Sequence, residues 1–345
     1  MKARLLILSL FSFVKRILYF SPQLYNIIVF LPLLTVFNSE ASKKSLRFVL
    51  IFFLIIIATG NISLFFSFLP ICMLFIYKPS FENYSFEATL KKLIYLYVAL
   101  SLYGIYQLFF GFTSFENSWI NSGLGMIGSE NFNIEKSIRP FSTFAGVPEF
   151  TFFCALFAYY FYIKKKKTLL LTSIIMLMIS GSRGIIASTI IAFTVIYFLK
   201  NNSYKKMLIK GFLLSLIIFI GLIFIYPLIF QFSYDSSSRV LVYGTFNGRI
   251  FNWIELLDKS SYLNFLFGNI NSTYTELTTD NLYLNLILKL GIFGFIYFYS
   301  FFLNIKLNEK SVYFFTIFLG YSFYADVIFS YYMMFPFFFA IYSKK

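Results

Sequence analysis

The arginines are the side chains of this sequence best suited to hold an anion. Only seven of its 29 basic residues are Arg, and five of the seven lie away from the lysine-rich segments: Arg16, Arg139, Arg183, Arg239 and Arg249. A guanidinium stays protonated in a low-dielectric setting, and its planar fork pairs with a phosphate or carboxylate through two parallel hydrogen bonds. These positions therefore predict binding of a phosphate or a carboxylate.

Arg183 is the most informative of them because it lies between two apolar runs, in the segment ISGSRGII. An ionised Arg at the centre of a membrane helix costs roughly 2.5–3.5 kcal/mol on insertion scales, so it should face a partner or a wet cavity. Gly181 and Gly184 permit a sharp turn and a close backbone approach there. The plainer interpretations are an Arg that extends to the membrane interface or one that pairs with a Glu.

Arg139 opens the segment RPFSTFAGVPEF, in which two prolines bracket a glycine and several hydroxyls. Such a segment is a poor continuous helix, and it fits a re-entrant or broken helix start that lines a cavity. An ordinary interfacial anchor is the alternative.

Among the acids, Glu149 is the one least easily explained by solvation, because it falls inside an apolar run. Most of the other acids outside the lysine-rich segments are expected to be solvated: Glu116, Glu130, Glu135, Asp235, Glu255, Asp258, Glu276, Asp280 and Asp326.

The sequence contains no His. A Ser-His-Asp triad, an HExxH zinc site and a haem-ligating imidazole are therefore excluded. The two cysteines, Cys72 and Cys154, lie far apart in apolar stretches and are interpreted as packing residues. No DxD-like acidic cluster is present, so we expect no metal and no other cofactor.

The elements that must position these residues are membrane helices. Of the 345 residues, 59% are hydrophobic and 12% charged, and the mean hydropathy is +0.78. Soluble enzymes are less apolar and more charged, so this composition argues against that class. The first apolar run lacks a small-residue cleavage site, so no cleavable signal is expected. Since a span needs about 20 apolar residues, and about 17 at least, we predict an all-α polytopic bundle, a single domain over 1–345, with about 12 spans. They are 4–20, 23–37, 46–59, 61–77, 93–112, 140–163, 168–181, 184–199, 208–230, 281–303, 311–325 and 327–342.

Orientation follows from the basic residues, which collect in cytoplasmic loops. With the N-terminus inside, the inner segments hold 20 of the 29 basic residues, so both termini are predicted to be cytoplasmic. The basic balance then reports membrane orientation and contact with anionic lipid head groups, and no nucleic-acid binding is expected.

Two outer segments are long, 113–139 and 231–280. Within the second, 248–269 is too polar to span, and its apolar residues suit a helix lying in the membrane interface: Phe251, Trp253, Ile254, Leu257 and Leu263. A helix that only packs on the bundle is an equal alternative.

Three segments, in this order, resemble the O-antigen polymerase (Wzy) and O-antigen ligase superfamily of bacterial envelope glycan assembly. RPFSTFAGVPEFTFFCALF (139–157) is similar to the family's Arg…Gly-Thr-Phe…Pro segment, and SGSRGIIASTIIAF (180–193) to its Ser-Arg-Gly segment. TTDNLYLNLILKLGIFGFIYF (278–298) is similar to its His-Asn…Tyr-Leu…Gly-Ile…Gly segment, except that Asp280 stands where ligases and many polymerases have His.

The resemblance implies a multi-pass glycosyltransferase of the bacterial inner membrane, which joins undecaprenyl-diphosphate-linked oligosaccharide repeat units at the outer face. The product would be O-antigen or capsular polysaccharide, in lipopolysaccharide or polysaccharide biosynthesis. Partners implied by the resemblance alone are a chain-length regulator and a flippase. We assign Arg139, Arg183 and Arg249 to the diphosphate, and Asp280 or Glu149 to the acceptor hydroxyl's proton.

Three alternatives stay open. One is a purely structural membrane subunit, which would give no reason for the outer arginines. An O-antigen ligase is disfavoured by the missing His. A flippase or other transporter of the same lipid-linked units should show paired repeats, charges inside spans and short loops. The long outer segment 231–280 and the missing repeat count against it.

Overall fold

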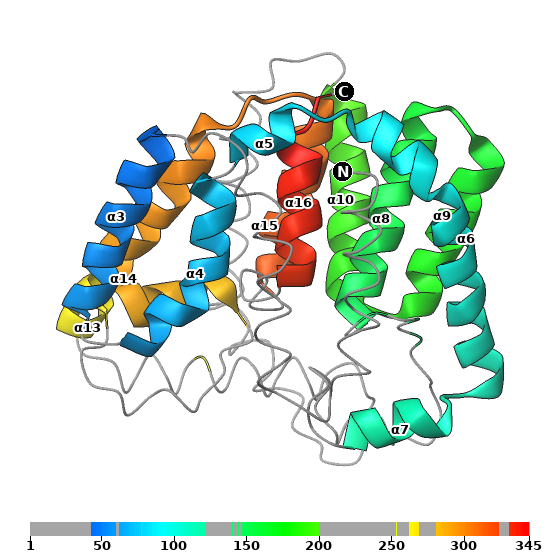
Figure 1. Ribbon diagram of the computed structural model, residues 1–345, viewed down its shortest axis with the longest axis horizontal. Helices are drawn as coiled ribbons and strands as arrows, with labels where there is room; N and C mark the ends of the chain where they lie inside the picture. The colour runs from blue at the N-terminus through cyan, green and yellow to red at the C-terminus, as the bar shows by residue number, and fades with distance from the viewer. Residues whose placement is uncertain are drawn as a thin grey trace, which may run out of the picture.

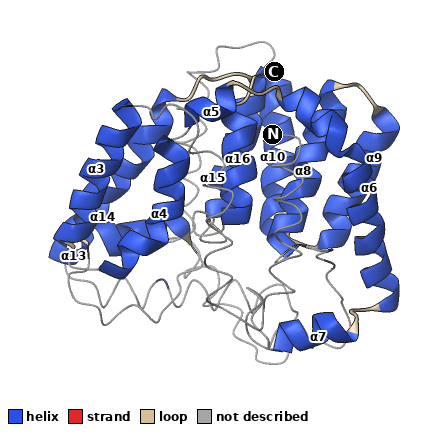
Figure 2. Ribbon diagram, in the orientation of Figure 1, coloured by secondary structure: helices blue, strands red, loops and turns tan. Residues whose placement is uncertain are grey.

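The computed structural model describes residues 43–59, 62–76, 78–121, 147–199, 262–268, 281–323 and 331–344, with the single positions 140, 142, 144 and 253. Over this part of the chain the secondary structure is helical, and only an isolated bridge joins Ser85 to Lys344 (Figure 2). The predicted all-α class is therefore confirmed. The predicted spans 4–20, 23–37 and 208–230 lie outside the described residues.

The longer helices stand side by side, and most of them begin and end near one of two ends of the bundle (Figure 1). Their bounds are α3 Lys43–Ala58, α4 Ile62–Ile76, α6 Phe86–Phe110, α8 Val147–Ile163, α9 Lys167–Ser180, α10 Arg183–Leu199, α14 Leu282–Ser300, α15 Glu309–Ser322 and α16 Tyr331–Tyr342. Four short helices link them or lie at the ends: α5 Lys78–Glu82, α7 Ser114–Asn121, α13 Tyr262–Phe267 and the 3₁₀ turn η4 Phe301–Asn304. By length and composition, α6 and α14 could each cross a membrane.

Each predicted span that falls on described residues coincides with a helix, but two differ from expectation. The prediction that a span begins at residue 140 is wrong, since α8 begins at Val147 and Ser142 has a left-handed backbone with φ +52°. Pro148 fits the first turn of α8, where no backbone N–H is needed for the helix.

The second difference is in α14, which is broken at Gly291 (φ +71°, ψ +172°). On a continuous helix, residues 283 and 299 would be about 24 Å apart. Instead the rings of Tyr283 and Tyr299 stack with centroids 5.8 Å apart. The helix found over the predicted span 281–303 is therefore broken: two arms of nine residues, about 13 Å each, meet at an angle at Gly291 (Figure 1).

The break is fixed by α13. A Cβ on Gly291 would lie 2.3 Å from the carbonyl oxygen of Leu266, and a Cβ on Gly268 would lie 2.6 Å from that of Lys289. Because glycine has no Cβ, the two backbones can approach this closely. Both glycines also have positive φ, which other residues seldom adopt. Of the predicted interfacial face, Leu263 lies exposed on α13 and Trp253 is buried.

Aromatic side chains fill the core. On one side of the bundle, Phe52 of α3 contacts Phe68 of α4 and Phe298 of α14, with ring centroids 5.2 Å and 5.6 Å away. On the other, Tyr159 of α8 stacks on Tyr313 of α15 at 4.7 Å. Cys72 and Cys154 are buried in this core as free thiols.

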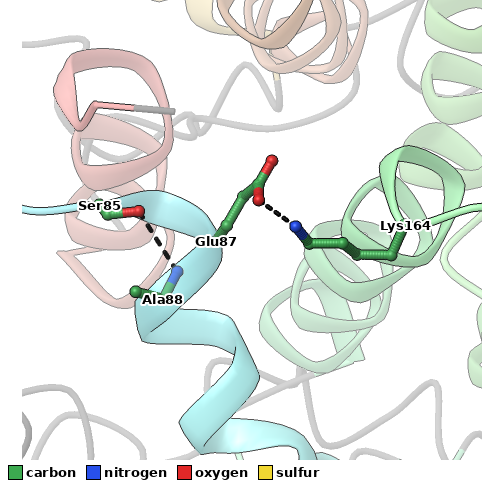
Figure 3. Close-up of polar contacts among 4 residues, drawn as sticks. All are labelled: Ser85, Glu87, Ala88 and Lys164. Atoms are coloured by element: carbon green, nitrogen blue, oxygen red, sulfur yellow. Dashed lines mark hydrogen bonds and ion pairs between the residues drawn. The ribbon is translucent and has the colours of Figure 1, made fainter.

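Thirteen of the fifteen basic residues in the described part lie at one end, which we call the basic end: Lys43, Lys44, Arg47, Lys78, Lys91, Lys92, Lys164, Lys165, Lys166, Lys167, Lys306, Lys310 and Lys344. Here α6 begins with Ser85 as its N-cap, whose Oγ accepts from the Ala88 N–H, and Glu87 pairs with Lys164 from the end of α8 (Figure 3). This pairing raises the pKa of Lys164.

The C-terminal residues are tied to the same end. The Lys344 N–H donates to the Tyr84 carbonyl, and the Phe86 N–H donates to the Lys344 carbonyl, each at 2.8 Å. The buried Lys310 donates to the carbonyl and hydroxyl of Ser343. The basic end is thus held together by its own lysines and backbone.

Candidate functional site

The end opposite to the basic end, which we call the opposite end, is where α8, α10 and α14 begin. Thr151 in the second turn of α8 shares a 2.7 Å hydrogen bond with Ser180, the last residue of α9. Gly181 then caps α9 in the left-handed conformation, and Arg183 starts α10 two residues later. The tight turn predicted at ISGSRGII is therefore present.

Of the fifteen described basic residues, two lie away from the basic end: Arg183 at the start of α10 and Lys289 in the first arm of α14. The side chain of Arg183 is exposed, and within the described part of the chain it has no ion-pair or hydrogen-bond partner. Among the described residues, the interpretation of Arg183 as one half of a Glu ion pair is not supported. A guanidinium presented in this way remains open to an anion from outside the protein.

Glu149 lies in the first turn of α8 and is 4% exposed. Its burial agrees with its place in an apolar run. Glu149 does make an interaction in the structure, and a buried carboxylate in an apolar helix is unusual, so it remains a candidate proton acceptor.

A polar network lies nearby, between α6, α7 and the segment that leads into α8. The fully buried Gln107 donates from Nε2 to Glu116 Oε1 at 2.6 Å and to the Ser142 carbonyl at 3.0 Å, and its Oε1 accepts from the Ser142 N–H at 2.7 Å. Tyr103 adds a hydroxyl donor to Glu116 Oε1 at 3.0 Å. Ser142 Oγ donates to the Leu100 carbonyl at 2.7 Å.

The sequence does not predict this network. Glu116 was expected to be a solvated loop charge, but it is 1% exposed. One local signal was available: Thr113 and Glu116 stand in the T-x-x-E spacing of a capping box, and the structure has both reciprocal hydrogen bonds. The contact with Gln107, a lone amide in an apolar run, is not visible from local sequence.

The start of α14 reaches this end through α15. Tyr283 donates to the Leu319 carbonyl at 2.7 Å, and its ring lies 4.5 Å from that of Phe323. On the other side of α15, a Cβ on Gly320 would lie 2.5 Å from Ser188 Oγ, five residues into α10. The beginnings of α14 and α10 thus flank the same end of α15.

Asn281 caps α14 with its side chain, which accepts from the Leu284 N–H at 3.1 Å, and it is fully buried. The residue before it in sequence is Asp280. Asp280, Arg139 and Arg249 lie outside the described residues. Of the predicted site residues, the structure therefore places Arg183 and Glu149 at the opposite end, and the geometry of the other three is not described.

Within the described residues, no cluster of three or more Cys, Asp or Glu side chains could hold a metal ion. The polar groups of this end can bind an anion through Arg183 and can accept a proton through a carboxylate. Comparison of the chain with protein-family models, curated proteins and solved structures found no match.

Proposed function

We propose that this protein is a membrane glycosyltransferase that polymerises undecaprenyl-diphosphate-linked oligosaccharide repeat units at the outer face of the bacterial inner membrane. The chain then spans the membrane about 12 times, with the basic end in the cytoplasm. Large apolar side chains on the outward faces of the helices support this placement, because a soluble protein rarely exposes so many. Examples are Leu54, Leu102, Leu171, Ile190 and Phe198.

The observation that carries the proposal is the exposed, unpartnered Arg183 at the opposite end, in a chain that places nearly all its other described basic residues at the basic end. Positive-inside topology needs only lysines, and it gives no reason for a guanidinium on the outer side. The undecaprenyl tail of the substrate lies in the membrane, which holds the attached diphosphate at the outer surface. Arg183, with Arg139 and Arg249, is suited to bind it.

In the proposed reaction, a hydroxyl oxygen of the incoming repeat unit forms a bond to the anomeric carbon of the growing chain. The bond from that carbon to the diphosphate oxygen breaks, and undecaprenyl diphosphate leaves with the electron pair. The hydroxyl proton passes to a carboxylate, Asp280 or Glu149. Because the leaving group is already an anion, the arginines act by stabilising its charge and by positioning it.

The broken α14 also fits this proposal. Each arm is about 13 Å long, less than half of the roughly 30 Å hydrocarbon core, so neither arm crosses alone. Discontinuous helices of this kind are tolerated where they are buried in protein or line a water-filled cavity. The first arm begins beside α15 at the opposite end, and it is the element directly after Asp280.

Orientation is tested by topology reporters fused to the full chain. A reporter inserted after Lys165, in the exposed link between α8 and α9, should be cytoplasmic. One inserted after Asn117, in α7 at the opposite end, should be extracytoplasmic. If both lie on the same side of the membrane, the proposed outer site is wrong.

Function is tested by the lipopolysaccharide or capsule ladder of a strain that lacks this chain. Loss of a polymerase leaves core plus a single repeat unit, and re-expression of the chain restores the ladder. Loss of a ligase would leave no attached repeat, and loss of a flippase would trap the units inside. Either of the last two patterns replaces the proposal with the corresponding alternative.

A further inference from the structure

The buried network around Gln107 shapes the segment that separates two of the proposed site residues. In sequence, Arg139 lies three residues before Ser142, and Glu149 lies seven residues after it. The side-chain amide of Gln107 is hydrogen-bonded to both the backbone N–H and the backbone carbonyl of Ser142. The backbone at Ser142, which lies between these two residues in sequence, is thus held by one side chain of α6.

The conformation held in this way is an unfavourable one for the chain by itself. Ser142 has φ +52°, a left-handed backbone that residues other than glycine seldom adopt. Its N–H, carbonyl and hydroxyl are all occupied by Gln107 and Leu100. The turn is therefore imposed by tertiary contacts and should relax when they are lost.

Glu116 orients the side-chain amide of Gln107, which holds the backbone of Ser142. Its Oε1 accepts from Gln107 Nε2 and from the Tyr103 hydroxyl, which fixes the amide with Nε2 toward α7 and Oε1 toward the Ser142 N–H. Its Oε2 serves the capping box with Thr113. The cap alone does not explain the contacts of Oε1.

We propose that Glu116 is a positioning residue, which acts through Gln107 to set the turn at Ser142 and so the placement of the Arg139–Glu149 segment. This inference rests on the proposed function and deepens it. Glu116 is nearly fully buried and both its oxygens accept hydrogen bonds from the protein, so it is not itself the proton acceptor of the reaction. Glu116 thus positions the backbone, whereas Glu149 is a candidate for accepting the proton.

The test compares Glu116→Gln with Thr113→Val in the full-length protein in nanodiscs. Glu116→Gln keeps the shape but places an amide where Oε1 and Oε2 accept hydrogen bonds. Thr113→Val keeps the shape and removes only the capping hydroxyl. The first readout is amide hydrogen exchange of the peptide that contains Ser142, whose N–H is protected by Gln107.

We expect exchange at Ser142 to speed up by about tenfold or more in Glu116→Gln, with α10 and α15 unchanged, since one charge-assisted bond is lost locally. Thr113→Val should affect only the start of α7. Unchanged exchange at Ser142 in Glu116→Gln overturns the proposal. An equal effect of Thr113→Val also overturns it, because Glu116 would then be only a helix cap.

The second readout is chain extension in a double-mutant cycle with Arg139→Lys. If Glu116 acts through this segment, Glu116→Gln should reduce extension strongly in the wild-type background and much less once Arg139 is already changed. Independent, multiplicative losses, or full extension despite faster exchange, contradict the positioning role.

The two readouts separate this inference from the proposed function. If the unmutated chain restores no ladder, the proposed function fails, and the exchange experiment still decides whether Glu116 sets the turn. If Glu116→Gln does not accumulate, Tyr103→Phe removes a single donor to Oε1 and must show the same local pattern in smaller size. No change at Ser142 in Tyr103→Phe would then count against the inference.

Discussion

Lys310 at the basic end and Arg183 at the opposite end are both cations in the first turn of a helix, yet their surroundings differ. Lys310 is buried, donates to Ser343 and lies over the ring of Phe86, with Nζ 5.1 Å from its centroid. Arg183 is exposed and has no ion-pair or hydrogen-bond partner among the residues that the structure describes. Lys310 therefore stabilises the fold, and the guanidinium of Arg183 is accessible to a ligand.

The acidic side chains show the reverse pattern, because they are more buried at the opposite end than at the basic end. At the basic end, Glu87 is half-buried and pairs with an exposed lysine. At the opposite end, Glu116 and Glu149 are both buried. Changes to buried groups at the basic end should therefore act on stability, and changes to the proposed site residues at the opposite end should act on activity.

The largest expected effect is on the proton acceptor. Asp280→Asn should abolish chain extension at normal protein level, because an amide cannot take the acceptor's proton. Glu309→Gln, the same kind of change in the first turn of α15 at the basic end, is the control and should extend chains normally. The ladder is measured in the deletion strain.

Full ladders in Asp280→Asn would move the assignment to Glu149, and Glu149→Gln should then be inactive. Full ladders in both variants would leave the opposite end without a dedicated base.

The next effect is on the break in α14. Gly291→Ala places a Cβ 2.3 Å from the Leu266 carbonyl oxygen and forces a non-glycine residue to φ +71°. Left-handed backbone at such a residue costs on the order of 1–3 kcal/mol before the clash is counted. Membrane abundance and thermal stability in detergent should both fall.

Gly104→Ala is the matched control. It remains in helical backbone and meets only side-chain atoms, the nearest being Phe150 Cζ at 3.0 Å. If Gly291→Ala is as stable as Gly104→Ala, the broken geometry of α14 is wrong.

Lys310→Met tests the basic end. It removes the donor that holds Ser343 and should cost about 1–3 kcal/mol of stability, because buried acceptors lose their partner. The activity of each folded molecule should stay at the wild-type level. A large loss of activity at unchanged stability would contradict the division between the two ends.

The smallest effect is expected for Lys164→Gln. The pair with Glu87 is partly exposed, and exposed pairs seldom contribute measurably (Figure 3). Stability, abundance and ladder length should all match the wild type. A clear loss in any of them would assign this pair a role that its exposure does not suggest.

Much of the fold was predictable because long apolar runs bounded by lysines define helices and their direction. The break at Gly291 was not, since the sequence LKLGIFGF offers two glycines and only the contact with Gly268, 23 residues earlier, selects one of them. Gly294, three residues on, stays helical.

The site was predictable only in part, for the same reason. Arg183 and Glu149 were singled out because a charge in an apolar run is locally visible. Glu116 was not, because its burial depends on Gln107 in another helix and on Ser142, 26 residues later. Long-range hydrogen bonds of this kind leave no periodic pattern in the sequence.

Diphosphate binding by Arg183 at the opposite end is tested most directly by comparing Arg183→Lys with Arg47→Lys. Both arginines are exposed near the start of a helix, at opposite ends of the bundle. Lys keeps the charge and loses the paired hydrogen bonds, so loss of one such bond should lower the rate by roughly ten- to a hundred-fold. Measured as ladder length at equal membrane abundance, Arg183→Lys should give short or no chains and Arg47→Lys wild-type chains. Wild-type ladders from Arg183→Lys at normal abundance would contradict the diphosphate role.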